Sequence, residues 1–258
     1  MDRSERKRGI IELFDAQAGF GGGRRGQPWV PSAEELLGHM ERLSIARTLV
    51  QTDFEEMDSD PMFSNQLLYE ACAQHEPLVP CPTVLPRGHG DVPSEREQID
   101  ELIAHGSGAA TLRPGQDGWS TAEWCAGTLL GLLEERRIPI LCRDSALGFE
   151  AIADLASRHP ELPIVMFHLG YRSQRTLVSL MKAFANVYLA IGSPYSVHLG
   201  LESMAGHVGA ERLLFGTGFP YAEPMASITM LTYSDLSDAG KQLVGSGNLD
   251  RLIGGIRR

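Results

Sequence analysis

The sequence is poor in cysteine and has no long hydrophobic run. Its four cysteines, at positions 72, 81, 125 and 142, are widely spaced and form no CxxC pair, which predicts reduced, mostly buried thiols and no disulfide scaffold. The longest apolar runs, such as residues 162–167, have the length of a strand, whereas a span across a bilayer needs roughly 20 residues. The first nine residues are charged and lack the apolar stretch of a secretory signal. These absences predict a cytoplasmic protein.

The sequence also lacks an excess of positive charge. Its net charge of −10 at pH 7 would repel nucleic acid and anionic lipid. The one basic cluster, residues 3–8, lies at the N-terminus, where a frayed and solvated end is commoner than a binding arm. We therefore expect no nucleic-acid or membrane partner. We also expect a flexible tail over residues 1–9 and a single domain over residues 10–258.

What the sequence does have is a regular alternation of short, β-branched apolar runs with longer amphipathic segments. This alternation is typical of βα units around a parallel sheet. Eight strands are expected, over residues 10–14, 46–51, 78–85, 109–112, 138–142, 164–167, 187–191 and 213–215. No GxGxxG fingerprint of an open, nucleotide-binding sheet is present. The pattern predicts an α/β protein with a closed (β/α)8 barrel, the TIM barrel, in one domain.

Helical segments lie between these strands, and three of them follow a serine with a glutamate three residues later. Ser32 with Glu35, Ser94 with Glu97, and Ser120 with Glu123 each predict a capping box at a helix start. Later helices are expected over residues 147–158, 174–184, 198–208, 223–235 and 238–253.

In a (β/α)8 barrel, chemistry takes place at the carboxyl ends of the strands and in the loops that follow them. Several polar and charged residues fall at these positions, and they are the candidate site residues: Asp15, Gln17, Arg87, Arg113, Arg143, His168, Arg172 and Tyr195.

Two segments carry a family resemblance. Residues 163–170, Pro-Ile-Val-Met-Phe-His-Leu-Gly, and residues 211–220, Glu-Arg-Leu-Leu-Phe-Gly-Thr-Gly-Phe-Pro, are similar to the strand-six HxG end and the strand-eight ERLLFGSDxP segment of one family. That family is the amidohydrolase-related family, which includes aminocarboxymuconate-semialdehyde decarboxylase and dicarboxylate lactonases. The resemblance spans roughly residues 10–253 and implies an amidohydrolase-type barrel with hydrolase or lyase activity.

The resemblance also implies a metal, held by an HxH pair after strand one, a histidine after strand five and an aspartate after strand eight. Here Gln17 and Gly19 stand at the HxH positions, Arg143 at the strand-five position and Gly218 at the strand-eight position. Glycine has no donor, an amide oxygen is a poor zinc ligand, and a guanidinium has no lone pair. We expect no metal and no cofactor, with Arg143 filling the vacated position and pairing with Asp15 or a substrate anion.

The arginines at the strand ends predict a small anionic ligand, because a guanidinium matches a carboxylate or phosphate. The expected substrate-binding residues are Arg143, Arg113, Arg172, Arg87, Gln17 and Tyr195. The alternative is that each arginine forms a structural ion pair, for instance with Asp117. Tyr195 has an alternative role too, since such aromatic residues often pack helices onto the barrel.

His168 and Asp15 are the candidate catalytic residues, the histidine as a general base. Alternatively, His168 bonds a neighbouring backbone and Asp15 neutralises Arg143. Two functions therefore remain open. One is a metal-independent enzyme that binds a small carboxylate-bearing or phosphorylated compound and hydrolyses or decarboxylates it; the other is a catalytically inactive pseudoenzyme that acts as a binding or assembly module. Related barrels often pair through their helices, so a homodimer is a further expectation.

Overall fold

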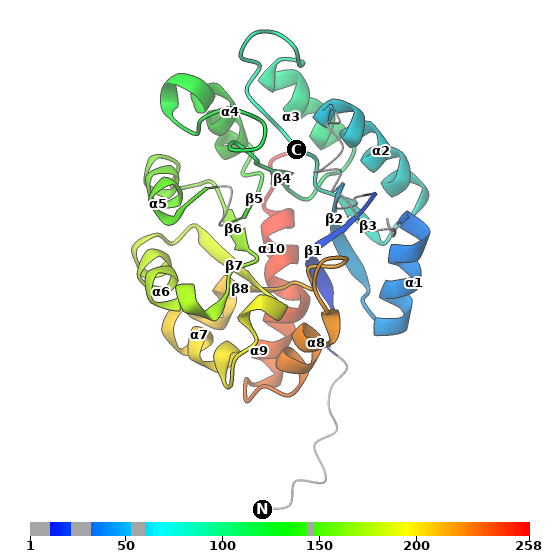
Figure 1. Ribbon diagram of the computed structural model, residues 1–258, viewed down its shortest axis with the longest axis vertical. Helices are drawn as coiled ribbons and strands as arrows, with labels where there is room; N and C mark the ends of the chain where they lie inside the picture. The colour runs from blue at the N-terminus through cyan, green and yellow to red at the C-terminus, as the bar shows by residue number, and fades with distance from the viewer. Residues whose placement is uncertain (1–10, 22–31, 53–59, 144–146) are drawn as a thin grey trace, which may run out of the picture.

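The computed structural model describes residues 11–21, 32–52, 60–143 and 147–258, and of Arg143 the backbone alone. A ring of parallel strands is surrounded by helices (Figure 1). The strands are β1 Phe14–Phe20, β2 Arg47–Thr52, β3 Leu78–Pro80, β4 Ala110–Thr111, β5 Ile140–Arg143, β6 Ile164–Phe167, β7 Val187–Ile191 and β8 Leu213–Phe215. The helices are α1 Ala33–Leu43, α2 Pro61–Gln74, α3 Glu95–Ala104, α4 Glu123–Glu135, α5 Phe149–Arg158, α6 Gln174–Ala183, α7 Gly200–Val208, α8 Pro224–Thr232, α9 Asp238–Gln242 and α10 Asn248–Gly254. The predicted tail, residues 1–9, lies outside the described residues.

The strands form two parallel ladders that close into a ring. One ladder has the order β1-β2-β3 and the other runs from β4 to β8 in sequence order. A bridge between Thr83 and Thr111 joins the ladders on one side, and a bridge between Ala18 and Phe219 joins them on the other. The chain is therefore a single-domain (β/α)8 barrel, as the alternation in the sequence predicted.

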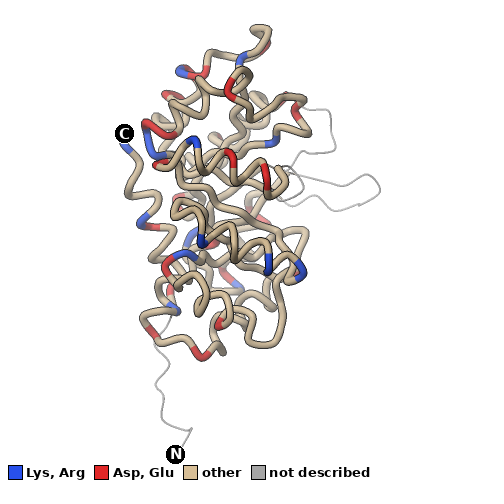
Figure 2. The backbone as a smooth tube through the Cα atoms, turned by 90° about the vertical axis from the view of Figure 1, so that its left-hand side faces the viewer, with Lys and Arg blue, Asp and Glu red and all other residues tan. Residues whose placement is uncertain are grey.

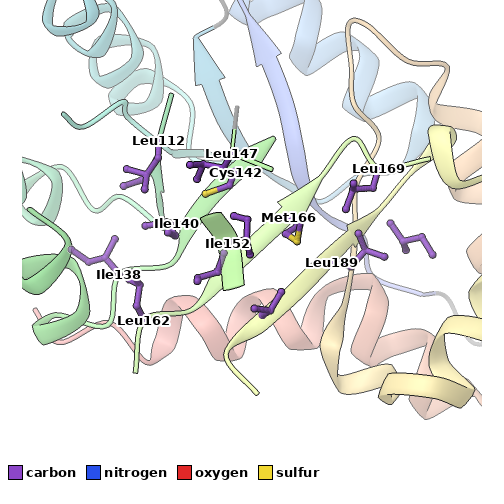
Figure 3. Packing of buried hydrophobic residues seen from close by; sticks show 14 of the residues in the cluster. Leu112, Ile138, Ile140, Cys142, Leu147, Ile152, Leu162, Met166, Leu169 and Leu189 are labelled. Atoms are coloured by element: carbon purple, nitrogen blue, oxygen red, sulfur yellow. The ribbon is translucent and has the colours of Figure 1, made fainter. Parts of the chain in front are cut away.

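The core has two layers, because side chains alternate between the two faces of each strand. Leu141 of β5 belongs to the interior of the barrel, together with Phe14, Leu49, Val165 and Leu214. The neighbours Ile140 and Cys142 belong to the outer layer, between the strands and the helices (Figure 3). Burial raises the pKa of Cys142. It faces the helices as expected from the alternation, so it is no candidate nucleophile.

Helix α10 closes the amino-terminal end of the barrel, opposite the expected site. Leu249 and Leu252 of α10 pack into the interior layer, and the Nδ2 of Asn248 donates to the carbonyl of Leu213 at the start of β8, at 2.8 Å. Asp250 pairs with Arg47 at the start of β2, at 2.8 Å. Figure 1 accordingly shows α10 in the middle of the ring of strands. Among the described residues, no helix is both long and apolar enough to cross a membrane.

Two predicted strands are corrected. The first, over residues 10–14, is wrong, because β1 begins at Phe14 and continues to Phe20. Asp15, Gln17 and Gly19 are consequently residues of the strand, where the sequence suggested a loop after it. The strand predicted over residues 78–85 is too long, since β3 ends at Pro80, and Pro80 and Pro82 have no N–H to extend a ladder.

Two of the three predicted capping boxes are confirmed. Ser32 and Ser94 each accept a hydrogen bond from the backbone N–H three residues on, and Glu35 and Glu97 reciprocate. The box at Ser120 is wrong, because α4 is preceded by Ala122, which provides no side-chain cap. The Ser120 hydroxyl instead accepts from the N–H of Ala122 at 3.2 Å, one turn before the helix. Helix α2, for which no range is predicted, begins with Pro61 after an Asp60 cap.

Candidate functional site

The site begins where the carboxyl end of β1 meets the segment that follows β8. The N–H of Gly218 donates to the carbonyl of Gln17 at 2.8 Å, and the N–H of Gly19 donates to the carbonyl of Phe219 at 2.9 Å. These bonds extend the barrel ladder past the end of β8. They bring side by side two of the three segments at which the family resemblance places metal ligands.

Asp15 is held at this junction by Thr217. The carboxylate is 1% exposed, and its Oδ1 accepts from the backbone N–H groups of Thr217 and Gln17, each at 2.9 Å. Its Oδ2 accepts from the hydroxyl of Thr217. Burial raises the pKa of Asp15 to about 6, although all three hydrogen bonds oppose the rise. The carboxyl can therefore hold or release a proton close to neutral pH.

Gln17 reaches across the barrel to His168. The Nε2 of Gln17 lies 3.1 Å from the Nδ1 of His168, which directly follows β6. An amide N–H can donate only to an unprotonated ring nitrogen, so this pairing places the proton of a neutral His168 on Nε2. His168 has a left-handed backbone, with φ of 64°, which is uncommon for any residue other than glycine. The structure thus brings together Gln17 and His168, two predicted site residues that are 151 positions apart.

Gly218 leaves room for the Gln17 amide. Its φ of 74° favours glycine, and a Cβ there would lie 3.0 Å from the Cβ of Ala222 and 3.5 Å from the Nε2 of Gln17. A Cβ on Gly216 would also approach Gln17, at 3.5 Å from its Cβ. The side chain of Gln17 therefore occupies space that a larger residue at position 218 would need.

Three of the four predicted arginines, Arg87, Arg113 and Arg172, have side chains that the structure describes. Arg113 makes a two-point ion pair with Asp117, with Nε and Nη2 at 3.3 and 3.2 Å from the carboxylate oxygens, and its side chain is only 14% exposed. Arg87 and Arg172 are exposed on the surface. The pairing of Arg113 matches the structural alternative in the sequence analysis. The side chain of Arg143 lies outside the described residues, so its role stays a prediction.

Tyr195 lies in the outer layer of the core. It ends a short 3-10 turn after β7, is 1% exposed and packs with the residues between strands and helices. Burial raises its pKa to about 12, and its hydroxyl has no hydrogen-bond partner within the described parts of the chain. This position fits the packing role that the sequence left open for it.

The residues at the junction do not fit a metal. Gly19 and Gly218 offer no side-chain donor, Gln17 turns its amide nitrogen toward His168, and both oxygens of Asp15 already accept hydrogen bonds. Among the described residues, no three His, Cys, Asp or Glu side chains lie close enough together to hold an ion.

Two buried polar residues of this region were not among the predicted site residues. Thr217 is fully buried, and its position directly before Gly218 in the strand-eight segment was the available signal. Cys81 lies in the interior layer with its Sγ 3.3 Å from the Oγ1 of Thr111. Burial raises the pKa of Cys81 to about 12, so it stays a thiol, and a thiol is a weak nucleophile.

Comparisons with known proteins agree with this architecture. The amidohydrolase family model matches residues 28–254. The 5-carboxyvanillate decarboxylase of Novosphingobium aromaticivorans, solved with manganese and 4-hydroxy-3-methoxy-5-nitrobenzoic acid, has a TM-score of 0.76 at 13% identity, covering 95% of this chain and 96% of that one. A 2,6-dihydroxybenzoate decarboxylase solved with 2,6-dihydroxybenzoate has a TM-score of 0.73 at 14% identity, covering 95% and 98%. The Rhizobium 2,6-dihydroxybenzoate decarboxylase has a TM-score of 0.71 at 15% identity, covering 95% and 99%. No curated protein matches the sequence.

Proposed function

This chain belongs to the amidohydrolase family, and we propose that it is a metal-independent member that binds a small carboxylate-bearing compound at the barrel mouth and hydrolyses or decarboxylates it. The observation that supports this most is the 3.1 Å contact between Gln17 and His168. Gln17 stands at one of the positions at which the family resemblance places metal ligands, and its amide contacts His168 instead. The structural neighbours named as decarboxylases, one of them solved with manganese, suggest the substrate class.

We assign the proton transfer to His168. With Nδ1 accepting from Gln17, its proton is on Nε2, and the imidazole is a donor where the sequence suggested a base. In a decarboxylation, the bond between the carboxyl carbon and the substrate breaks, CO2 leaves, and the electron pair stays on the substrate carbon. The Nε2 proton then moves to that carbon, and His168 recovers a proton from water.

A substrate carboxylate needs a positively charged side chain to bind it, and we propose Arg143 for this role. Its backbone ends β5 and pairs in register with Phe167, the residue before His168. Arg113 is a weaker candidate, because Asp117 already neutralises its charge. Its Nη1 has no acceptor among the described residues and can still donate. We propose Asp15 as a positioning residue that ties the end of β8 to β1 through Thr217.

Binding and turnover are tested separately. Thermal-shift titrations with 2,6-dihydroxybenzoate and small dicarboxylates should stabilise the wild type, because a ligand that binds only the folded state raises its stability. The shift should disappear in Arg143→Ala and persist in Arg175→Ala, which removes an exposed arginine of α6. For any compound that binds, CO2 release or hydrolysis should be lost in His168→Ala while binding remains.

The pseudoenzyme is the second candidate, and one observation favours it. The carboxylates and guanidinium of Asp15, Arg113 and Asp117 are engaged with protein partners, so these side chains are already satisfied without substrate. Ligand binding without turnover in the wild type would establish this second function. Absence of binding across the whole panel would contradict the proposed enzyme.

A further inference from the structure

A cavity lies at the opposite end of the barrel from the candidate site, beside α10. It has a volume of about 400 Å³ and is lined by residues that precede or begin three neighbouring strands, together with residues of α10. Its polar lining residues are Arg137, Glu161, Asn186, Tyr188 and Arg251. Pockets of this size accommodate small organic molecules. In Figure 2 the segment that ends at the C-terminus runs along one edge of the molecule, with Lys and Arg positions beside it.

The two arginines keep unused hydrogen-bond donors. Arg137 pairs through Nη2 with Glu161, and Arg251 donates through Nη2 to the carbonyl of Glu211 at 2.9 Å and to Asn248 at 3.4 Å. Within the described residues, the Nε and Nη1 groups of both arginines have no acceptor. The hydroxyl of Tyr188 has none there either. The cavity therefore presents several donors that only water or a ligand can satisfy.

The charge of this cavity is opposite to that of the whole chain. The protein carries a net charge of −10, whereas the cavity is lined by two arginines and one glutamate. The Cζ of Arg212 lies 5.4 Å from the ring centroid of Tyr188, and the Cζ of Arg251 lies 5.8 Å from the same centroid. A local positive potential in a concave site favours an anion.

The remaining lining residues have apolar side chains or none. They are Pro160, Pro163, Ala185, Leu252 and Gly255. We propose that this cavity is a second binding site, for a small organic anion whose carboxylate or phosphate contacts Arg137, Arg251 and the hydroxyl of Tyr188, with an apolar body against the prolines. This site is independent of the function proposed for the barrel mouth.

Because Arg137 and Glu161 form an ion pair, changes at these two residues should have opposite effects on ligand affinity. The side chains of Arg137 and Glu161 are 42% and 57% exposed, and such partly exposed pairs contribute little to stability. A ligand anion must compete with Glu161 for Arg137. Glu161→Gln should therefore strengthen binding, whereas Arg137→Gln should weaken it, and neither change should unfold the protein.

The probes are three molecules that share one ring: benzoate, phenyl phosphate and phenol. In calorimetric titrations of the wild type, benzoate or phenyl phosphate should bind, and phenol should not. The dissociation constant should rise about tenfold in Arg137→Gln and in Tyr188→Phe, since each removes donors to a charged group. It should fall in Glu161→Gln and stay unchanged in the matched control Arg175→Gln. Repeating each titration in Arg143→Ala separates this cavity from the mouth.

Each outcome decides the proposal. Binding of phenyl phosphate alone identifies an organic phosphate site, and binding of benzoate alone identifies a carboxylate site. If phenol binds as tightly as the two anions, the cavity is merely apolar and the proposal is wrong. It is also wrong if neither anion binds, or if affinity is the same in wild type, Arg137→Gln and Glu161→Gln.

Discussion

Asp15 is a carboxylate that the fold keeps away from water while still surrounding it with donors. Burial is the stronger effect and raises its pKa to about 6 from an ordinary value of 3.8. The folded protein therefore binds the Asp15 proton more tightly than the unfolded chain does. Below about pH 4 both states are protonated and Asp15 imposes no penalty. Between about pH 4 and 6 the folded state holds more protons, so stability falls as the pH rises.

Asp15→Asn should remove this dependence, because an amide has nearly the same shape and no charge. Relative to the variant, the wild type should lose about 2 kcal/mol of unfolding free energy between pH 4 and pH 7. Urea unfolding at a series of pH values measures the difference. The variant Asp91→Asn, at an exposed carboxylate, controls for the loss of one charge. A wild type and Asp15→Asn that follow parallel pH profiles would contradict the assignment.

Gly218 should tolerate no side chain. Gly218→Ala is expected to lower the unfolding free energy by about 1–3 kcal/mol, because of its positive φ and the 3.0 Å approach to Ala222. Gly131→Ala is the matched control, since a Cβ there, in the middle of α4, meets nothing within 4 Å. That change should stabilise the protein slightly. Thermal unfolding of both variants gives the comparison, and equal effects would refute the steric argument.

Among the helices, the two confirmed capping boxes should contribute measurably to the unfolding free energy, and Ser120 should not. Ser32→Ala and Ser94→Ala should each cost about 1 kcal/mol, the usual value for losing an N-cap hydroxyl. Ser120→Ala should change stability much less, because Ser120 lies before α4 and caps no helix. Urea unfolding of the three variants tests this ranking. A loss at Ser120 as large as that at Ser32 would show that Ser120 caps α4 after all.

The elements also show what the sequence could predict. The strands at residues 164–167, 187–191 and 213–215 were predicted with the bounds that the structure has, because each is a short apolar run between clear breaks. The first strand was predicted too early in the chain. β1 pairs with β2 on one side and, through Ala18, with Phe219 on the other, and no local sequence pattern reveals a partner so distant in the chain. The same holds for the site: Asp15 meets Thr217, 202 positions away. Family motifs identified Gln17, His168 and Gly218, but only the fold shows that the first two touch.

In the barrel as a whole, α10 covers the amino-terminal end of the strands and completes the interior layer of the core. Leu249 is 2% exposed and packs among interior residues of the strands. Leu249→Ala should lower the unfolding free energy by about 2–5 kcal/mol through lost burial and a cavity. Leu243→Ala, at a residue 39% exposed just before α10, should cost far less. Chemical unfolding compares the two, and a small effect at Leu249 would mean that α10 contributes little to closing the barrel.

We propose that Gln17, hydrogen-bonded to His168, has taken over one ligand position of the family's metal centre and that the protein holds no transition metal. Elemental analysis tests it most directly, on protein expressed with added zinc and manganese and purified without chelator. We predict a transition-metal content well below one ion per chain, unchanged in His168→Ala. One tightly held ion per chain, lost in His168→Ala, would contradict the account.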